Sequence, residues 1–144
     1  MLPTATVDST GLYSMTFTPT RSDAYSVVWP QWQDRETTTV AAGTMTVKAV
    51  VSLKHKKPSG LSVDVSGTAS PATDRIAAVV NIQAKAPGKK KFKTIATVPM
   101  PEGQSTYSTT ITLASSGTWI IRAQYVDTGA VTSGTSKSVH VTLS

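Results

Sequence analysis

Apolar and polar residues alternate along six short runs in the last two-thirds of the chain. In the first run Leu61, Val63 and Val65 share one parity, and in a later one Trp119 faces away from Arg122. A period of two is typical of half-buried β-strands. The alternation therefore predicts strands over 61–71, 78–86, 92–98, 107–113, 118–125 and 138–143. The inward side chains expected in these runs also include Val80, Ile82, Ala84, Phe92, Ala96, Val98, Tyr107, Thr109, Ile111, Leu113, Ile121, Ala123, Tyr125, Val139, Val141 and Leu143.

Turn signals separate these runs every eight to twelve residues. They include "APGKKK" at 86–91, "PMPEGQS" at 99–105 and "ASSG" at 114–117. Proline, glycine and serine at such positions favour tight reversals. The chain is also rich in Thr, Ser and Val, which favour strands over helices. We expect an all-β, antiparallel sandwich with a total of seven strands and little or no helix.

A stretch near the start is repeated near the end. "YSMTFTPTRSDAYSVVW" begins at Tyr13 and "YSTTITLASSGTWIIRA" begins at Tyr107, 94 residues later. The same offset aligns Tyr25 with Trp119. A constant offset over some forty residues indicates tandem duplication of a module whose size is typical of an immunoglobulin-like sandwich.

The first copy of this module is incomplete. It has counterparts for only the last three strands, expected over 12–19, 24–32 and 43–51. We therefore predict a partial module over 1–50 and a complete one over 51–144, joined by an exposed link, "SLKHKKPSG". Three strands with one apolar side need a cover, which could be the complete module, a second copy of the chain or a different protein. We expect another protein chain, in a homo-oligomer or larger assembly, over a face that carries Tyr13, Phe17, Tyr25, Val27, Trp29, Met45 and Val47.

Several elements of the complete copy match a known pattern. They are the "SGTASPA" turn, the valine-rich strand after it, the lysine-bearing hairpin, the "SGTW" entry to a strand and the final "TSKSV". With these the chain resembles the bacterial Ig-like repeat domains of actinobacterial exported proteins and of the tail and head proteins of their phages. The resemblance covers about two-thirds of the chain fully. It implies an immunoglobulin-like fold and a role as spacer, adhesion module or virion decoration, without catalytic or metal residues. This chain has no cysteine pair beside Trp119, unlike disulfide-pinned Ig domains.

Residues that could carry chemistry are sparse. His55 and His140 are both expected in solvated positions, and the eight acidic residues are scattered without a pair at acid/base or ligand spacing. The chain also lacks cysteine and contains no nucleophile, phosphate-binding or metal motif. We expect a protein that is not an enzyme and that uses no metal and no cofactor.

Two features stand above this background, the first of them basic. The chain has a formal net charge of +6. Its clustered lysines could attract an anionic surface polymer or glycan, or they could be solvated residues that discourage edge pairing. Nucleic acid is disfavoured because Phe92 is the only aromatic residue among these lysines, whereas base stacking uses several interleaved rings. The lysines in question are Lys54, Lys56 and Lys57, and Lys89, Lys90, Lys91 and Lys93.

The second feature is aromatic. Trp32 follows Pro30 in an expected loop. It could contact a glycan or a protein, or simply cover the open end of the partial module.

Three settings are compatible with these patterns. The stretch "MLPTATVDSTG" has neither the basic nor the apolar region of a signal peptide, and no run in the sequence is long enough to cross a membrane. We expect a capsid-decorating or tail-associated protein at a virion surface, because virions leave by lysis. The alternatives are a C-terminal repeat of an exported bacterial cell-surface protein, and an accessory polymer-binding module of a wall-active enzyme.

Overall fold

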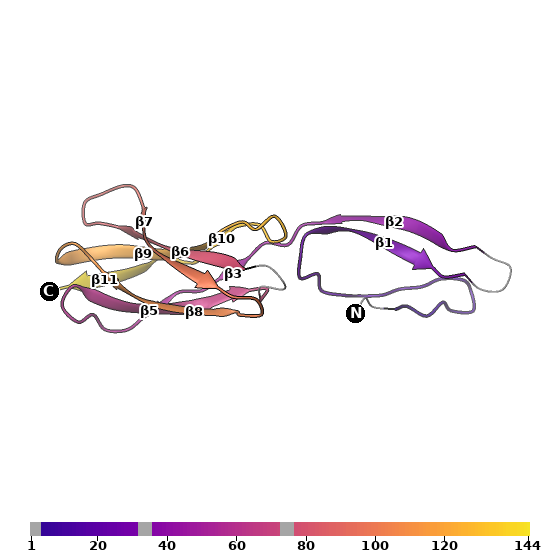
Figure 1. Cartoon of the computed structure of the whole chain (residues 1–144), viewed down its shortest axis with the longest axis horizontal. Coiled ribbons are helices and arrows are strands. Elements are labelled where there is room, and N and C mark those ends of the chain that lie inside the picture. Colours follow the sequence, from indigo (N-terminus) through magenta and orange to yellow (C-terminus); the bar gives the residue numbers. More distant parts are fainter. Residues whose placement is uncertain (1–3, 32–35, 73–76) are drawn as a thin grey trace.

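The computed structural model describes residues 4–31, 36–72 and 77–144, and every regular element among them is a β-strand. The strands form a sandwich and a smaller hairpin unit that lie end to end (Figure 1). All strand pairs are antiparallel. The strands are β1 (Asp23–Trp29), β2 (Thr38–Met45), β3 (Val50–Val51), β4 (Lys54–His55), β5 (Ser62–Ser70), β6 (Ala78–Lys85), β7 (Lys93–Met100), β8 (Thr106–Thr112), β9 (Gly117–Tyr125), β10 (Gly134–Thr135) and β11 (Val139–Leu143).

The sandwich consists of two facing sheets. In one sheet β5 is central, with β3 and β4 along one edge and β8 along the other. In the other sheet β9 pairs with β10 and β11 on one side and with β6 on the other, and β7 follows β6 at the edge. The sequence-based prediction of an all-β, antiparallel sandwich is therefore confirmed at this level.

Alternating side chains of both sheets fill the space between them. β6 and β9 each show strict alternation of buried and partly exposed residues. Trp119 is 7% exposed, and its indole nitrogen donates a hydrogen bond to the Ser115 carbonyl at 3.0 Å. Burial of such side chains is the main favourable contribution to folding. The buried core also contains Val63, Val65, Val80, Ile82, Ala84, Tyr107, Ile111, Leu113, Ile121, Ala123, Tyr125, Val141 and Leu143.

Two expected inward residues are placed differently. Leu61 precedes β5 and is 38% exposed. Phe92 precedes β7, and its ring contacts Lys85 and Arg122, whose positions on β6 and β9 alternate with the buried ones. The inward orientation expected for these two residues is wrong because each lies just outside a strand, where the alternation of side chains does not hold.

The segment expected to be an exposed link is instead the first edge of the sandwich. Val50 and Val51 pair with Ser70 and Ala69, and β4 pairs with β5 further along. Ala49 is buried in the core, 4% exposed. The sandwich therefore begins ahead of Val51, and the boundary predicted at 50/51 cuts through its first strand.

The N-terminal unit contains one hairpin, in which β1 pairs with β2. The expected strand over 12–19 is not formed. Its counterpart in the repeat, β8, pairs with β5, and the described residues of the N-terminal unit offer no equivalent of β5. A strand forms only where its backbone groups find a partner.

The hairpin also departs from the register of the repeat. In the sandwich, Gly117 lies opposite Leu143, so a strict copy would place Asp23 opposite Ala49. Asp23 lies opposite Met45 instead, four residues earlier. The register differs because Ala49 is buried in the sandwich core and cannot also pair with Asp23 in the hairpin.

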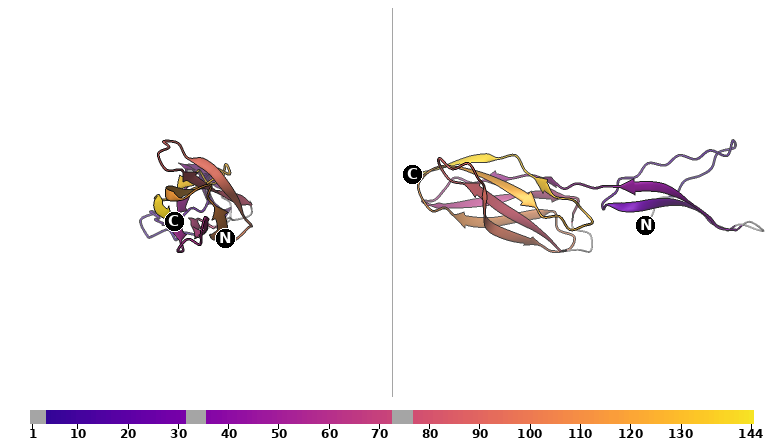
Figure 2. Two further views of the ribbon diagram at one scale, coloured as in Figure 1. Left: turned by 90° about the vertical axis from the view of Figure 1, so that its left-hand side faces the viewer. Right: turned by 90° about the horizontal axis from the view of Figure 1, so that it is seen from above.

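The two units touch through a narrow junction. The backbone N–H of Ser22 donates to the Ala130 carbonyl, and the Val47 N–H donates to the Ser22 hydroxyl at 2.8 Å. Thr132 in turn donates to the Val47 carbonyl at 2.9 Å. Seen from above, the hairpin unit extends away from the sandwich, and the C-terminus lies at the opposite end (Figure 2).

Candidate functional site

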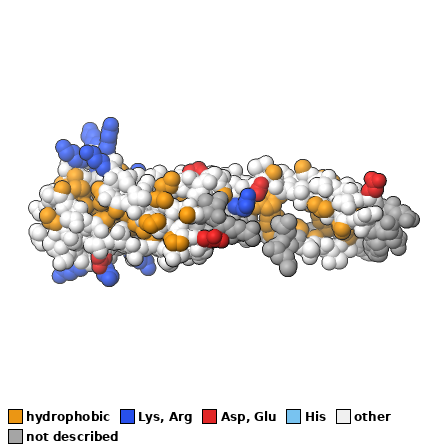
Figure 3. Space-filling view, viewed as in Figure 1, with side chains coloured by type: hydrophobic (Ala, Val, Ile, Leu, Met, Phe, Trp, Pro, Cys, Tyr) orange, Lys and Arg blue, Asp and Glu red, His pale blue; other side chains and the backbone are white. Residues whose placement is uncertain are grey.

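The N-terminal unit encloses an open apolar hollow. Its volume is about 550 Å³, and none of the described residues that line it is charged. In Figure 3 hydrophobic side chains surround an opening in this part of the molecule. The lining residues are Thr4, Ala5, Val7, Tyr13, Met15, Phe17, Tyr25, Ser26, Val27, Val28, Trp29, Pro30, Ala42 and Met45.

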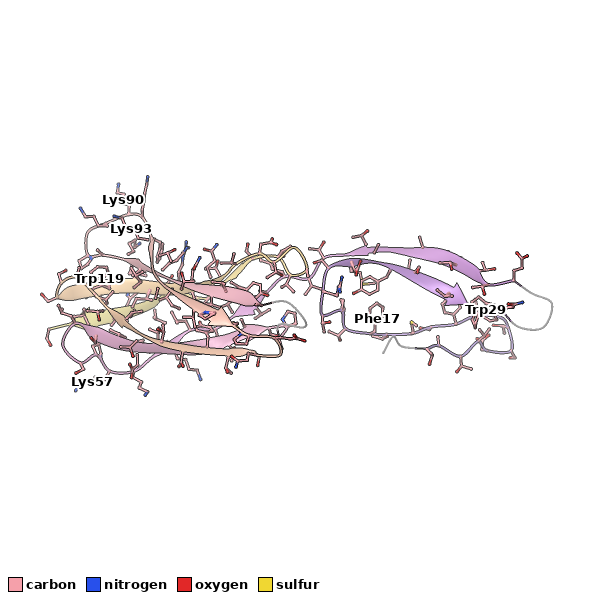
Figure 4. All side chains as sticks on the ribbon, viewed as in Figure 1. Phe17, Trp29, Lys57, Lys90, Lys93 and Trp119 are labelled. Carbon is pink, nitrogen blue, oxygen red and sulfur yellow. The ribbon has the colours of Figure 1, made fainter. Side chains whose placement is uncertain are left out.

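Two segments hold the aromatic residues of this hollow. Phe17, from the segment ahead of β1, lies with its ring centroid 5.2 Å from that of Tyr25 on β1. The Tyr25 hydroxyl donates to the Arg21 carbonyl at 3.1 Å. Tyr13 and Trp29 remain 48% and 44% exposed. Figure 4 shows Phe17 and Trp29 on the side of the hairpin that faces the N-terminal segment.

The residues predicted for an assembly face therefore come together, with one exception. Tyr13, Phe17, Tyr25, Val27, Trp29 and Met45 all line the hollow. Val47 does not, because it packs against the core of the sandwich. Sequence reasoning missed Met15, although it shares the parity of Tyr13 and Phe17. Trp32, the predicted glycan or protein contact, lies outside the described residues.

β1 also has a free edge. Among the described residues it pairs with β2 alone. Its counterpart β9 pairs on both sides, with β6 as well as with β10 and β11. A free strand edge next to an apolar hollow presents both the hydrogen-bonding groups and the side chains that an added strand would use.

The two lysine clusters lie on opposite sides of the sandwich. Lys54 is on β4, at the edge of one sheet, whereas Lys93 opens β7, at the edge of the other. Figure 4 shows Lys57 on one side and Lys90 and Lys93 on the other, and Figure 3 shows blue groups on both margins. The two clusters therefore belong to different sheets and do not form one continuous surface.

The acidic residues and histidines that the structure describes lie at scattered, exposed positions. A hydrogen bond from Thr110 and the charge of Lys56 keep the pKa of Asp64 below its usual value. His55 and His140 are both exposed. Within residues 4–31, 36–72 and 77–144 no group of three or more His, Asp or Glu side chains could hold a metal ion. The same residues include no helix capable of spanning a membrane.

Comparison with known proteins adds no further constraint. No protein-family model matches the chain, and no curated protein matches it in sequence.

Proposed function

We propose that the chain is a non-catalytic structural and attachment module with an immunoglobulin-like sandwich. The sheet composition supports this fold. β3 and β4, β5 and β8 correspond to strands A, B and E, while β6, β9 and the β10–β11 pair correspond to C, F and G. β7 then takes the edge position beside strand C.

One observation carries the attachment role, namely the uncharged hollow beside the free edge of β1. Soluble monomers rarely expose contiguous apolar patches of this kind, and such patches mark interfaces. An added strand from another protein chain would satisfy the β1 backbone and cover Tyr13, Phe17 and Trp29 together. The partner is a protein segment, supplied by a second copy of this chain or by another component of the assembly.

We place this module at a virion surface, as a capsid-decorating or tail-associated protein. The resemblance of the "SGTASPA" and "SGTW" elements to Ig-like repeats of phage proteins supports this setting. The same resemblance supports a bacterial cell-surface protein as the alternative. Neighbouring capsid or tail genes would favour the first setting, and neighbouring cell-wall genes the second.

A second candidate function is an accessory polymer-binding module. It rests on the hairpin lysines, which project together from one side of the sandwich. Retention on immobilised anionic cell-wall polymer would support it.

The assembly role is tested by oligomeric state. We expect the full chain to form oligomers, measured by light scattering across a range of protein concentrations. A version that begins at Thr46 keeps the first edge of the sandwich and lacks the hollow, so we expect it to be monomeric. A full chain that stays monomeric at all concentrations, and recruits no other chain in its native assembly, would contradict the proposal.

A further inference from the structure

Arg122 is held in a fixed position on the outer face of the sandwich. It lies on β9, the central strand of its sheet, opposite Gln83 on β6. Its guanidinium carbon is 4.0 Å from the centroid of the Phe92 ring, and its Nε donates to Gln83 Oε1 at 2.8 Å. Gln83 in turn donates to Gln124 at 2.7 Å. Stacking and this hydrogen-bond chain fix the plane of the guanidinium group.

The two terminal nitrogens of Arg122 remain available. Among the described residues no hydrogen bond or ion pair uses them. An arginine whose plane is already fixed loses little side-chain entropy when it binds a planar or tetrahedral anion with both nitrogens. The structure around Arg122 therefore resembles a prepared anion-binding group more than a solvated charge.

Other positively charged side chains lie near this arginine. Lys85 lies on the same face, and its Nζ is 5.4 Å from the centroid of the Phe92 ring, which Arg122 also contacts. The adjacent hairpin adds Lys89, Lys90, Lys91 and Lys93. The ion pairs found among the described residues join Arg21 to Asp23 and Lys56 to Asp64, so none neutralises this group. Uncompensated charges of one sign attract polyanions over about a Debye length, roughly 8–10 Å.

We propose that Arg122, Lys85 and the hairpin lysines form a binding site for the phosphate or carboxylate groups of an anionic glycan polymer. Arg122 binds one anionic group with both nitrogens, and the lysines attract the neighbouring groups along the polymer. This site is independent of the hollow in the N-terminal unit and does not depend on assembly.

Nucleic acid fits the site less well. Binding of single strands without sequence preference relies on bases stacking on aromatic rings. The Phe92 ring is already covered by Arg122 and Lys85. The other aromatic residues of the sandwich, Tyr107, Trp119 and Tyr125, are buried in its core.

The test measures affinity for three probes by fluorescence anisotropy, at low and high salt. Polyphosphate is the phosphate probe, polyglucuronic acid is the carboxylate probe, and single-stranded oligo-dT is the nucleic-acid probe. We expect at least one of the first two to bind more tightly than oligo-dT, with an affinity that falls as salt increases. Equal or tighter binding of oligo-dT would overturn the assignment to a glycan polymer.

Two matched triple variants separate a local site from net charge. The hairpin triple variant replaces Lys89, Lys90 and Lys91 with Gln and so removes three charges beside Arg122. The control triple variant replaces Lys54, Lys56 and Lys57 with Gln and removes three charges on the opposite side of the sandwich. All six lysines are exposed, so both variants should fold. We expect the hairpin triple to weaken binding about tenfold or more and the control triple to change it about twofold or less. An equal loss of affinity in both variants would show that binding depends only on net charge, and would overturn the proposal.

Arg122→Lys tests the prepared arginine itself. The variant keeps the charge and removes the two-nitrogen contact, so we expect a loss of about fivefold or more. Unchanged affinity, with a thermal midpoint close to that of the original chain, would exclude Arg122 from the site. The comparison of the two triples stands even if this variant is destabilised.

Discussion

Trp119 shows how much one inward position contributes to the sandwich. Its side chain is 7% exposed, and its indole N–H bonds to Ser115. We expect Trp119→Ala to lower the free energy of unfolding by about 3–5 kcal/mol, because it empties a large aromatic site in the core. Thermal or urea unfolding measures the change. As a control, Val50→Ala alters a side chain that is 72% exposed and should change stability little. Similar losses in both variants would show that the core is placed wrongly.

Tyr107 illustrates a contact that alternation alone does not reveal. Its inward position is predictable, but its hydroxyl donates to the Ser52 carbonyl, 55 residues away in the chain. Gly67 makes this possible, because a side chain there would collide with both the Tyr107 ring and the Ser52 carbonyl oxygen. Nothing in the sequence around Ser52 indicates this partner, since the pairing of β3 and β4 with β5 brings it there.

The same tyrosine predicts a loss of stability in alkali. Burial raises the pKa of Tyr107 to about 12, whereas an unfolded tyrosine titrates near 10. Ionisation therefore favours the unfolded chain, and this part of the stability is complete below about pH 10 and lost as the pH rises towards 12. We expect Tyr107→Phe to be less stable at neutral pH and to show a smaller decline over this interval. Urea unfolding at several pH values measures both. Identical alkaline slopes for the two proteins would contradict the expectation.

In the sandwich most of the long strands were predictable and the short ones were not, whereas in the N-terminal unit the strand expected over 43–51 was wrong, because β2 runs from Thr38 to Met45. β5, β6, β8, β9 and β11 match the predicted ranges to within one residue at each end, because each has one buried face that imposes a period of two. β3, β4 and β10 have two residues each, too few to show a period. β4 consists of a lysine and a histidine, a composition that predicts a loop. Its place is set by β5, whose edge it completes.

The first edge strand predicts where the sandwich can be cut. Gly134 packs so closely on Ala49 that a side chain there would collide with the Ala49 backbone. A chain that begins at Thr46 keeps this contact and β3, and a chain that begins at Ser52 loses both. We expect the shorter version to unfold about 10 °C lower or more, since one kcal/mol corresponds to roughly 4–8 °C in a domain of this size. Equal thermal midpoints would show that residues 46–51 contribute nothing to the sandwich.

The partial repeat was informative about composition and misleading about register. The offset of 94 residues correctly grouped Tyr13, Phe17, Tyr25 and Trp29 around one apolar space. It could not reveal that the segment from Val47 onward belongs to the sandwich, which moves the hairpin register by four residues. Similarity along a chain reports which side chains share a face, whereas register is decided by which segments compete for the same partner.

Across the whole molecule, polarity and charge are divided between the two units. The hollow, in the N-terminal unit, is lined by uncharged residues in the part of the chain that the structure describes. The hairpin lysines project from the sandwich at the other end of the molecule (Figure 4). Because the hollow and the hairpin lysines lie in different units at opposite ends of the molecule, a partner in the hollow and a polymer at the lysines would bind without obstructing one another.

A charge placed in the hollow should therefore disrupt assembly alone. Val27 lines the hollow, and in the assembled state an aspartate there would be buried without a partner. Because an uncompensated buried charge costs about 3–5 kcal/mol, we expect Val27→Asp to weaken assembly by roughly a hundredfold or more. Thr39→Asp adds the same charge to β2 at an exposed position that does not line the hollow, and its side chain has the opposite parity to Val40, the cross-strand partner of Val27. Light scattering should show dissociation in the first variant and little change in the second, with polyphosphate affinity alike in both. If Thr39→Asp dissociates the assembly equally, or Val27→Asp leaves it intact, then the chains meet through a different surface.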